Sequence, residues 1–189
     1  MSDDPYVYPG TNVLRNKLNL RDAGMLDRYE RELVTDRIAF GVPTGTFNLR
    51  HLQAIHRHLF QDVHNWAGKI RTLEIAKDGH QFQFRAYIQT GMADVHRRIV
   101  AARYLRGLPR EDFAARAGEI IGDLNYVHPF REGNGRTQLQ YLKQLAARAG
   151  HALDLTKLER ETWMHASREA HQARYDAMAR CIAAAVAGV

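Results

Sequence analysis

Several features that assign proteins to special classes are scarce or missing in this 189-residue sequence. Its one cysteine, Cys181, excludes a disulfide within the chain and favours a reducing compartment. No apolar run approaches the roughly 20 residues of a membrane-spanning helix, and the acidic opening MSDDPYVYPG lacks the apolar core of a signal peptide. We therefore expect a cytoplasmic protein that does not associate with membranes.

Common cofactor and metal motifs are also missing. The sequence contains no Walker A motif, no Rossmann glycine pattern and no His-Glu-x-x-His. Three histidines crowd one segment, His51, His56 and His58, but their spacings do not give the i, i+3 or i, i+4 pair that a helical metal site needs. A histidine metal centre is therefore not predicted.

Positive charge is in excess, with a formal net charge of +6 and a sequence pI of about 9.7. The cations are spread along the chain, and we interpret the most basic stretch, HRRIVAARYLRGLPR at 96–110, as a solvated helix face. Acidic proteins and phosphorylated ligands are compatible with this charge. Nucleic acid is not the partner that we expect.

The apolar pattern predicts one mostly α-helical domain over residues 1–189, with no repeat, low-complexity tract or linker. Residues 1–20 are rich in proline, glycine and asparagine and should form an irregular arm. Asn48 is the expected N-cap of the second helix. The first helical stripe consists of Met25, Leu26, Tyr29, Leu33 and Ile38, and further stripes lie at 49–59, 88–102, 113–127, 139–149 and near the C-terminus.

The segment 71–87 differs from the rest of the chain and predicts a β-hairpin. Apolar residues alternate in its two halves, as Leu73 with Ile75 and Phe82 with Phe84, and KDG at 77–79 is a turn signal. A lone hairpin is marginally stable, so this one must pack on helices or pair with another strand. For the two phenylalanines, packing within the hairpin and contact with a partner are both open.

The sequence HPFREGNGR at 128–136 concentrates polar groups between two apolar helices. Pro129 disfavours helical geometry at the preceding residue, so the first helix should end at His128. The second helix should begin near Asn134 or Gly135, and its glycine-lined N-terminus is suited to phosphate.

The remaining side chains of this loop suggest phosphoryl or nucleotidyl chemistry. Arg136 can add charged donors to a phosphate, Glu132 is an oxygen ligand for Mg²⁺ beside a polyphosphate, and His128 suits a general base. Phe130 should anchor the loop in the core. The alternative is a purely structural loop that caps two helices, and only the joint occurrence of these groups argues against it.

HPFREGNGR also resembles a known signature. It matches the Fic motif, His-Pro-Phe-x-(Asp/Glu)-Gly-Asn-Gly-Arg-x-x-Arg, at every fixed position through Arg136. DPYVYPGTNVLRNKL, FQDVHNWAGKIR and LAARAGH are similar to the family too, so the resemblance covers nearly the whole chain. It implies the helical Fic fold with one β-hairpin flap. The implied activity is transfer of AMP from ATP to a Tyr, Ser or Thr hydroxyl of a target protein.

The resemblance implies a role for each motif residue. His128 would deprotonate the target hydroxyl, and Glu132 would hold Mg²⁺ at the α- and β-phosphates of ATP. Gly133, Asn134 and Gly135 would form an anion hole, and Arg136 would contact the polyphosphate. The hairpin resembles the family's flap, which binds an extended target segment by strand addition. Its expected docking residues are Lys77, Asp78, Gly79, His80, Gln81 and Phe82.

Leu139 departs from the signature, whose last position is an arginine that binds the terminal phosphates. Because Leu139 lies three residues beyond Arg136, both should share the helix face that points at the phosphate tail. Losing a charged hydrogen bond costs about 1.5–3 kcal/mol, so ATP binding or positioning should weaken at least about tenfold. Gln140 is a candidate for a weaker neutral contact.

Three interpretations of Leu139 stay open: a slower AMP transferase, a transferase of a different nucleotide or phosphate-containing group, and a degenerate member that only binds a partner. The family's inhibitory motif, (Ser/Thr)-x-x-x-Glu-(Gly/Asn), has no match near either end of the chain, and His171 stands where its glutamate would be needed. The resemblance therefore implies the class whose inhibitor is a separate small antitoxin. The protein would be a bacterial toxin, or an effector delivered into a host cell.

Overall fold

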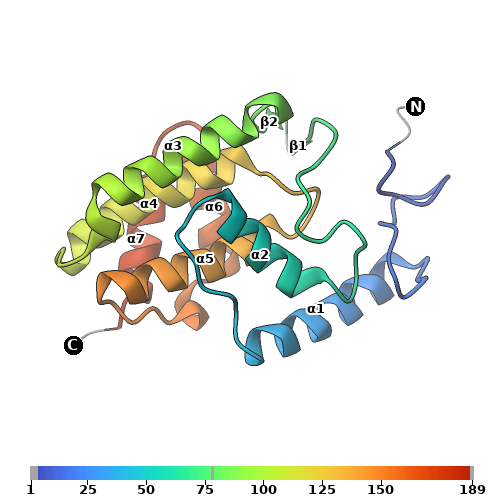
Figure 1. The fold of residues 1–189 in the computed structure, drawn as a ribbon, viewed down its shortest axis with the longest axis horizontal. Coiled ribbons are helices and arrows are strands. Elements are labelled where there is room, and N and C mark those ends of the chain that lie inside the picture. The colour runs from blue at the N-terminus through green and yellow to red at the C-terminus, as the bar shows by residue number, and fades with distance from the viewer. Residues whose placement is uncertain (1–3, 78, 188–189) are drawn as a thin grey trace.

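Seven α-helices supply most of the secondary structure in the computed structural model, which describes residues 4–77 and 79–187 (Figure 1). They are α1 (Ala23–Ala39), α2 (Leu49–Phe60), α3 (Ile88–Ala101), α4 (Arg110–Val127), α5 (Asn134–Ala149), α6 (Arg160–Ala170) and α7 (Asp176–Ala185). Single 3₁₀ turns lie at Arg85–Tyr87, Arg103–Leu105 and Leu155–Lys157, and strands β1 (Ala76–Lys77) and β2 (His80–Gln81) pair antiparallel. The predicted fold class, mostly helical with one hairpin, is confirmed.

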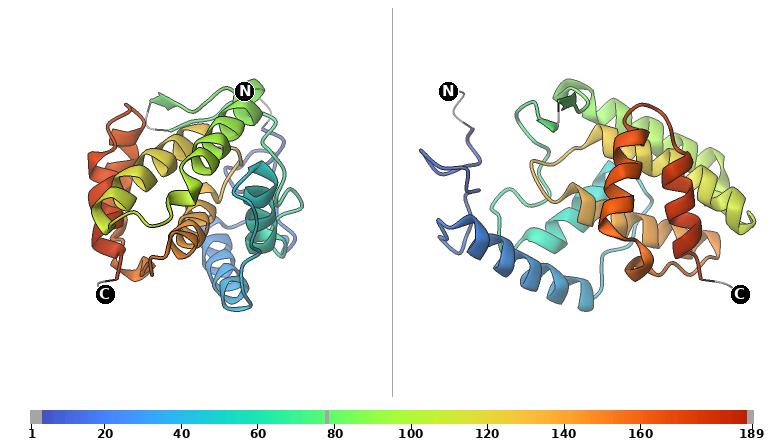
Figure 2. Two further views of the ribbon diagram at one scale, coloured as in Figure 1. Left: turned by 60° about the vertical axis from the view of Figure 1, so that its left-hand side comes forward. Right: turned by 180° about the vertical axis from the view of Figure 1, so that it is seen from behind.

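Helix α4 is the centre of the fold, because it packs against α3, α5, α6 and α7. Its inner side chains, among them Phe113, Ile121 and Leu124, are fully buried. A Cβ at Gly122 would lie 2.7 Å from the ring of Tyr175, so a glycine is needed where the N-terminus of α7 approaches α4. This close packing fixes the positions of α6 and α7, which lie side by side on the face away from α1 and α2 (Figure 2).

The buried face of α1 differs from the predicted stripe. Leu26, Glu30 and Val34 are buried, whereas Met25 and Tyr29 are 49% and 43% exposed. The prediction is confirmed for Leu26, and Leu33 and Ile38 are half-buried against the core. It was wrong for Met25 and Tyr29 because it counted only apolar residues, and a charged residue, Glu30, occupies the middle of the buried face.

The N-terminal arm and the start of α2 follow the prediction. Within its described residues, the arm over 1–20 has one isolated bridge, between Val7 and Leu14, and otherwise no strand and no helix. The Asn48 side chain accepts a hydrogen bond from the backbone N–H of His51 at 2.9 Å, which confirms it as the N-cap.

The hairpin is much shorter than the predicted span of 71–87. Its ladder pairs only Ala76 with Gln81 and Lys77 with His80, and residues 85–87 form a 3₁₀ turn. The ladder stops because backbone groups at its base bond elsewhere: the N–H of Gln83 donates to the carbonyl of Tyr126 at the end of α4. The hairpin therefore rests on α4 and on the loop that follows it. Across the described residues, no helix is both long and apolar enough to span a membrane.

Candidate active site

The loop between α4 and α5 is held in place by its own side chains. α4 ends just before His128, which takes a left-handed conformation with φ 45° ahead of Pro129. Phe130 is fully buried, as predicted, and stacks on the ring of His56 with centroids 3.9 Å apart. The Asn134 side chain accepts from the N–H of Phe130 at 3.0 Å and donates to its carbonyl at 2.8 Å. The hydrogen bonds of the Asn134 side-chain amide are therefore used within the loop, and only the backbone of this residue can face a ligand.

Two glycines shape the start of α5, which begins at Asn134 as predicted. Gly133 has φ +80°, and a Cβ there would lie 2.4 Å from the ring of Phe60, so a side chain does not fit. A Cβ at Gly135 would meet nothing within 4 Å, so this helix end opens on free space. Because the first N–H groups of a helix have no partner within it and carry the positive end of the dipole, the arrangement suits an anion.

The imidazole of His128 is oriented for proton transfer. Its Nδ1 donates to the carbonyl of Asn125 at 3.0 Å, which leaves Nε2 as the acceptor. Desolvation lowers the pKa of His128 to about 4, and the charges of Arg71 and Lys77 act in the same direction. The ring is therefore neutral near pH 7, the state that a general base requires.

The predicted motif residues line one pocket of about 430 Å³. It is bordered by His128, Glu132, Gly133, Asn134, Gly135 and Arg136, and by the hairpin residues Lys77, His80 and Phe82. Its opposite wall is α6 with the residue after it, which contribute Arg160, Trp163, Met164, Ser167, Arg168 and His171. This wall was missed at the sequence level because no motif marks it and it approaches the loop only in the folded chain.

A second groove of about 780 Å³ lies along the other side of the hairpin. Residues 72–77 form much of its lining, and Asp4, Pro5 and Arg131 face them. It shares Lys77, Phe82, His128 and Glu132 with the first pocket. His128 therefore lies between two hollows that approach it from different sides.

The predicted flap residues fall into different settings. Lys77 and His80 border the pocket, Gly79 forms the turn with φ +79°, and the Gln81 carbonyl accepts from His171 Nε2 at 3.0 Å. Asp78 lies outside the described residues. Strand β2 therefore faces α6, and β1 borders the second groove.

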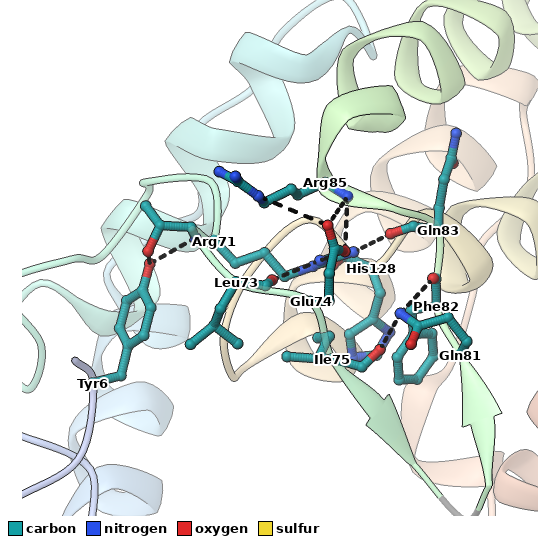
Figure 3. A network of polar contacts seen from close by, with 11 residues as sticks. Tyr6, Arg71, Leu73, Glu74, Ile75, Gln81, Phe82, Gln83, Arg85 and His128 are labelled. Carbon is teal, nitrogen blue, oxygen red and sulfur yellow. Dashed lines mark hydrogen bonds and ion pairs between the residues drawn. The ribbon is translucent and has the colours of Figure 1, made fainter. Parts of the chain in front are cut away.

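A buried arginine joins the hairpin base to the motif loop (Figure 3). Arg71 Nε donates to the carbonyl of His128 at 2.9 Å, and its other nitrogens donate to the carbonyls of Leu73 and Gln83 and to the carboxylate of Glu74. No role of Arg71 was predicted from the sequence. The only available signal was its place at the end of FQDVHNWAGKIR.

Comparison with known proteins agrees with this geometry. Residues 46–146 match the model of the Fic/DOC family. The chain is 38% identical over 184 residues to "Protein adenylyltransferase VbhT" of Bartonella schoenbuchensis, and 39% identical over 165 residues to "Probable protein adenylyltransferase y4lH" of Sinorhizobium fredii. These matches cover 96% and 87% of this chain, 38% of VbhT and 86% of y4lH. The chain belongs to the Fic/DOC family.

Solved Fic domains share the architecture. One, from a VirB-translocated Bep effector protein of Bartonella quintana with bound ADP, has a TM-score of 0.87 and 26% identity, covering 96% of this chain and 94% of that one. Another, the N-terminal Fic domain of Bep8 from Bartonella sp. 1-1C, has a TM-score of 0.86 and 26% identity, covering 94% and 92%. The helices and the short hairpin are therefore those of a Fic domain.

Leu139 lies on the Fic pocket, as predicted, and shares its lining with Arg136. It is half-buried and packs against the core, so it offers the pocket only carbon atoms. Gln140 is buried and is not among the lining residues, so the neutral contact expected from it is not available.

The expected magnesium ligand is a single carboxylate. Glu132 is about half exposed, and its Oε1 accepts from the N–H of Gly133 at 2.9 Å. Among residues 4–77 and 79–187, no group of three or more His, Cys, Asp or Glu side chains is placed to hold a metal ion. One carboxylate beside a helix end that suits an anion fits Mg²⁺, which is commonly bound by one or two carboxylates together with substrate phosphates and water.

Proposed function

We propose that this chain is a protein adenylyltransferase, which transfers AMP from ATP to a Tyr, Ser or Thr hydroxyl of a target protein. The observation that carries the proposal is the position of His128, with a neutral ring whose Nε2 is the acceptor, between two separate hollows. One hollow ends at the N-terminus of α5, where phosphates would bind, and the other follows the hairpin, where a polypeptide would lie. The names of the relatives VbhT and y4lH support this activity.

The chemistry follows from the positions of the polar groups. The target hydroxyl donates its proton to His128 Nε2 while its oxygen attacks the α-phosphorus of ATP. The bond from that phosphorus to the bridging oxygen breaks, and pyrophosphate leaves. Backbone N–H groups at Gly135 and its neighbours stabilise the negative charge on the α-phosphate oxygens. Glu132 would hold Mg²⁺, which supplies positive charge at the phosphates.

The hairpin would bind the target by main-chain pairing. The proposed docking surface runs from Lys77 to Phe82 and includes the outer edge of β1, which borders the second groove. A target strand added to this edge would be held by main-chain hydrogen bonds and would bring one side chain toward His128. β2 is less available for pairing because His171 already donates to Gln81.

Two finer points belong to the same proposal. The chain would act as a toxin restrained by a small antitoxin in trans, since its sequence has no inhibitory motif of its own. Leu139 would slow the reaction by leaving the terminal phosphates without one cation. Two alternatives to AMP transfer stay open because of Leu139. They are transfer of a different nucleotide or phosphate-containing group, and binding of a partner without catalysis.

The test is label transfer from ATP to protein. The chain is incubated with Mg²⁺, a bacterial lysate and ATP carrying label on either the α- or the γ-phosphate. We expect label on a protein band with the α-phosphate only, and loss of the band with His128→Ala. His165→Ala is the matched control, because His165 is exposed on α6 and borders neither the pocket nor the groove. Label from the γ-phosphate, or labelling that survives His128→Ala, would disprove the proposal.

A further inference from the structure

Glu30 is a buried charge that the proposed chemistry does not use. It lies in the middle of α1, with only 8% of its side chain exposed. Both carboxylate oxygens are engaged: Oε1 accepts from Arg136 at 2.5 Å, and Oε2 accepts from His64 Nε2 at 2.7 Å. Carboxylates are rarely buried unless they are paired, and here both partners are far from Glu30 in the sequence.

His64 completes the arrangement from the opposite side. It is fully buried and stacks on Trp66, with ring centroids 4.3 Å apart. Its Nδ1 lies 3.1 Å from the carbonyl of Arg15, and its Nε2 faces Glu30, so both ring nitrogens face acceptors. Glu30 therefore lies between the His64 ring and the Arg136 guanidinium.

The charge of Glu30 is maintained in this setting. Burial raises the pKa of its carboxyl group, but the hydrogen bond from His64 and the charge of Arg136 outweigh burial, and the net direction is down. The carboxylate is therefore ionised near neutral pH.

Arg136 connects this cluster to the pocket. One guanidinium nitrogen is bound to Glu30, and the group lies over the ring of Phe60, 4.7 Å from its centroid. The side chain is 32% exposed and borders the pocket beside Gly133 and Gly135. A guanidinium has five N–H donors in a rigid fork, so donors remain for a phosphate while Glu30 holds the group in place.

We propose that Glu30 is a positioning residue for nucleotide binding, which fixes Arg136 at the phosphate end of the pocket and is itself held by His64. The inference rests on the proposed function only in taking a nucleotide phosphate as the ligand. Glu30 itself does not border the pocket. By holding Arg136 in place before the nucleotide binds, Glu30 lowers the entropy cost of binding, because an unrestrained arginine would have to be ordered by the phosphate.

A binding titration tests this without any transfer reaction. ADP with Mg²⁺ is titrated into the wild-type chain and into Glu30→Gln, Arg136→Ala and the double variant. We expect Glu30→Gln to weaken binding about tenfold. The double variant should bind no more weakly than Arg136→Ala alone, because Glu30 acts only through Arg136. Glu32→Gln is the matched control, since Glu32 is exposed on the same helix and pairs with Arg28 at the surface.

The outcomes separate the two proposals. If the wild-type chain binds no nucleotide, the proposed function fails. If it binds and Glu30→Gln binds equally well or more tightly, the positioning role is wrong. Additive losses in the double variant would also overturn it.

A measurement on the wild-type chain keeps the inference testable if a variant does not fold. Nitrogen-15 NMR of the wild-type chain should show a proton on His64 Nε2, the ring nitrogen that faces Glu30, and melting curves report whether each variant is folded. A proton on Nδ1 alone would mean that His64 does not donate to Glu30 and would overturn this part of the inference.

Discussion

The imidazole of His128 stacks on the ring of Phe82, with centroids 3.8 Å apart and planes at 21°. Phe82 is buried, although it belongs to the hairpin that the sequence marked as a docking edge. In the structure the ring packs on the proposed general base and also borders the second groove, so contact with a target stays a prediction. The hairpin and the base are in direct contact.

Replacing Phe82 should alter the pH dependence of the reaction. Phe82→Ala exposes His128 to water, so its pKa should rise from about 4 toward the ordinary value of 6.5. A general base works when neutral, and activity is lost as the pH falls through its pKa, so the acid limb should move to higher pH. The rate near neutral pH should fall about tenfold. The measurement is a pH–rate profile of label transfer.

Phe84→Ala is the control for this experiment. Phe84 lies two residues further along and is 56% exposed, so its removal should leave the acid limb unchanged. Equal shifts in the two variants would contradict the role assigned to the stacking contact.

Restoring a cation at position 139 should strengthen ATP binding. Leu139→Arg would place a guanidinium on the pocket face that Arg136 shares, and affinity for ATP should rise about tenfold. AMP has no terminal phosphates, so its affinity should not change. Calorimetric titration of both nucleotides measures the difference, with Leu139→Met as the apolar control. An equal gain for AMP would show that the added charge acts nonspecifically.

His56 should make the fold sensitive to acid. It is fully buried, its Nδ1 accepts from the N–H of Gly68 at 2.8 Å, and desolvation lowers its pKa to about 4. The unfolded chain takes up this proton near pH 6.5, so stability is present above that pH and lost as the pH falls toward 4. The free energy of unfolding should fall by about 3 kcal/mol over this range, since each pKa unit corresponds to about 1.4 kcal/mol.

Urea unfolding between pH 7.5 and about 4 checks this expectation. His56→Gln should be less stable at neutral pH but should lose less stability on acidification. The exposed His165→Gln should follow the wild-type curve. If His56→Gln keeps the full acid slope, another buried group is responsible.

Two glycine substitutions should lower the free energy of unfolding by different amounts. Gly133→Ala combines φ +80° with a Cβ 2.4 Å from the Phe60 ring, and the free energy of unfolding should fall by at least about 2 kcal/mol. Gly150→Ala has φ +100° but meets nothing within 4 Å, so its cost should be about 1 kcal/mol. Thermal and urea unfolding of both variants measure the two costs. Equal losses would mean that the Phe60 contact relaxes freely.

The motif loop could be predicted because its determinants are local. Pro129 ends one helix, and the glycines open the next, so the positions of His128 and Gly133 follow from their neighbours in the chain. The same reasoning placed the Asn48 cap and the loop anchor Phe130 correctly.

The rest of the site depends on contacts between distant segments, which no local pattern records. The α6 wall and the pairing of Glu30 with Arg136 arise only when α1, α5 and α6 are packed, and the Arg71 bonds form only when the hairpin base lies against the loop after α4. The hairpin was predicted too long because Arg71 bonds to carbonyls that a longer ladder would have used. A buried charge such as Glu30 also shifts a helix face away from its apolar stripe.

Arg71 binds the backbone of the proposed base and both arms of the hairpin through a single planar group. The hairpin base at Leu73 and Gln83 and the backbone of His128 are therefore held together as one unit. In the proposed reaction, a target strand docked on β1 would be aligned with the proton acceptor by this unit, without any further movement of the loop.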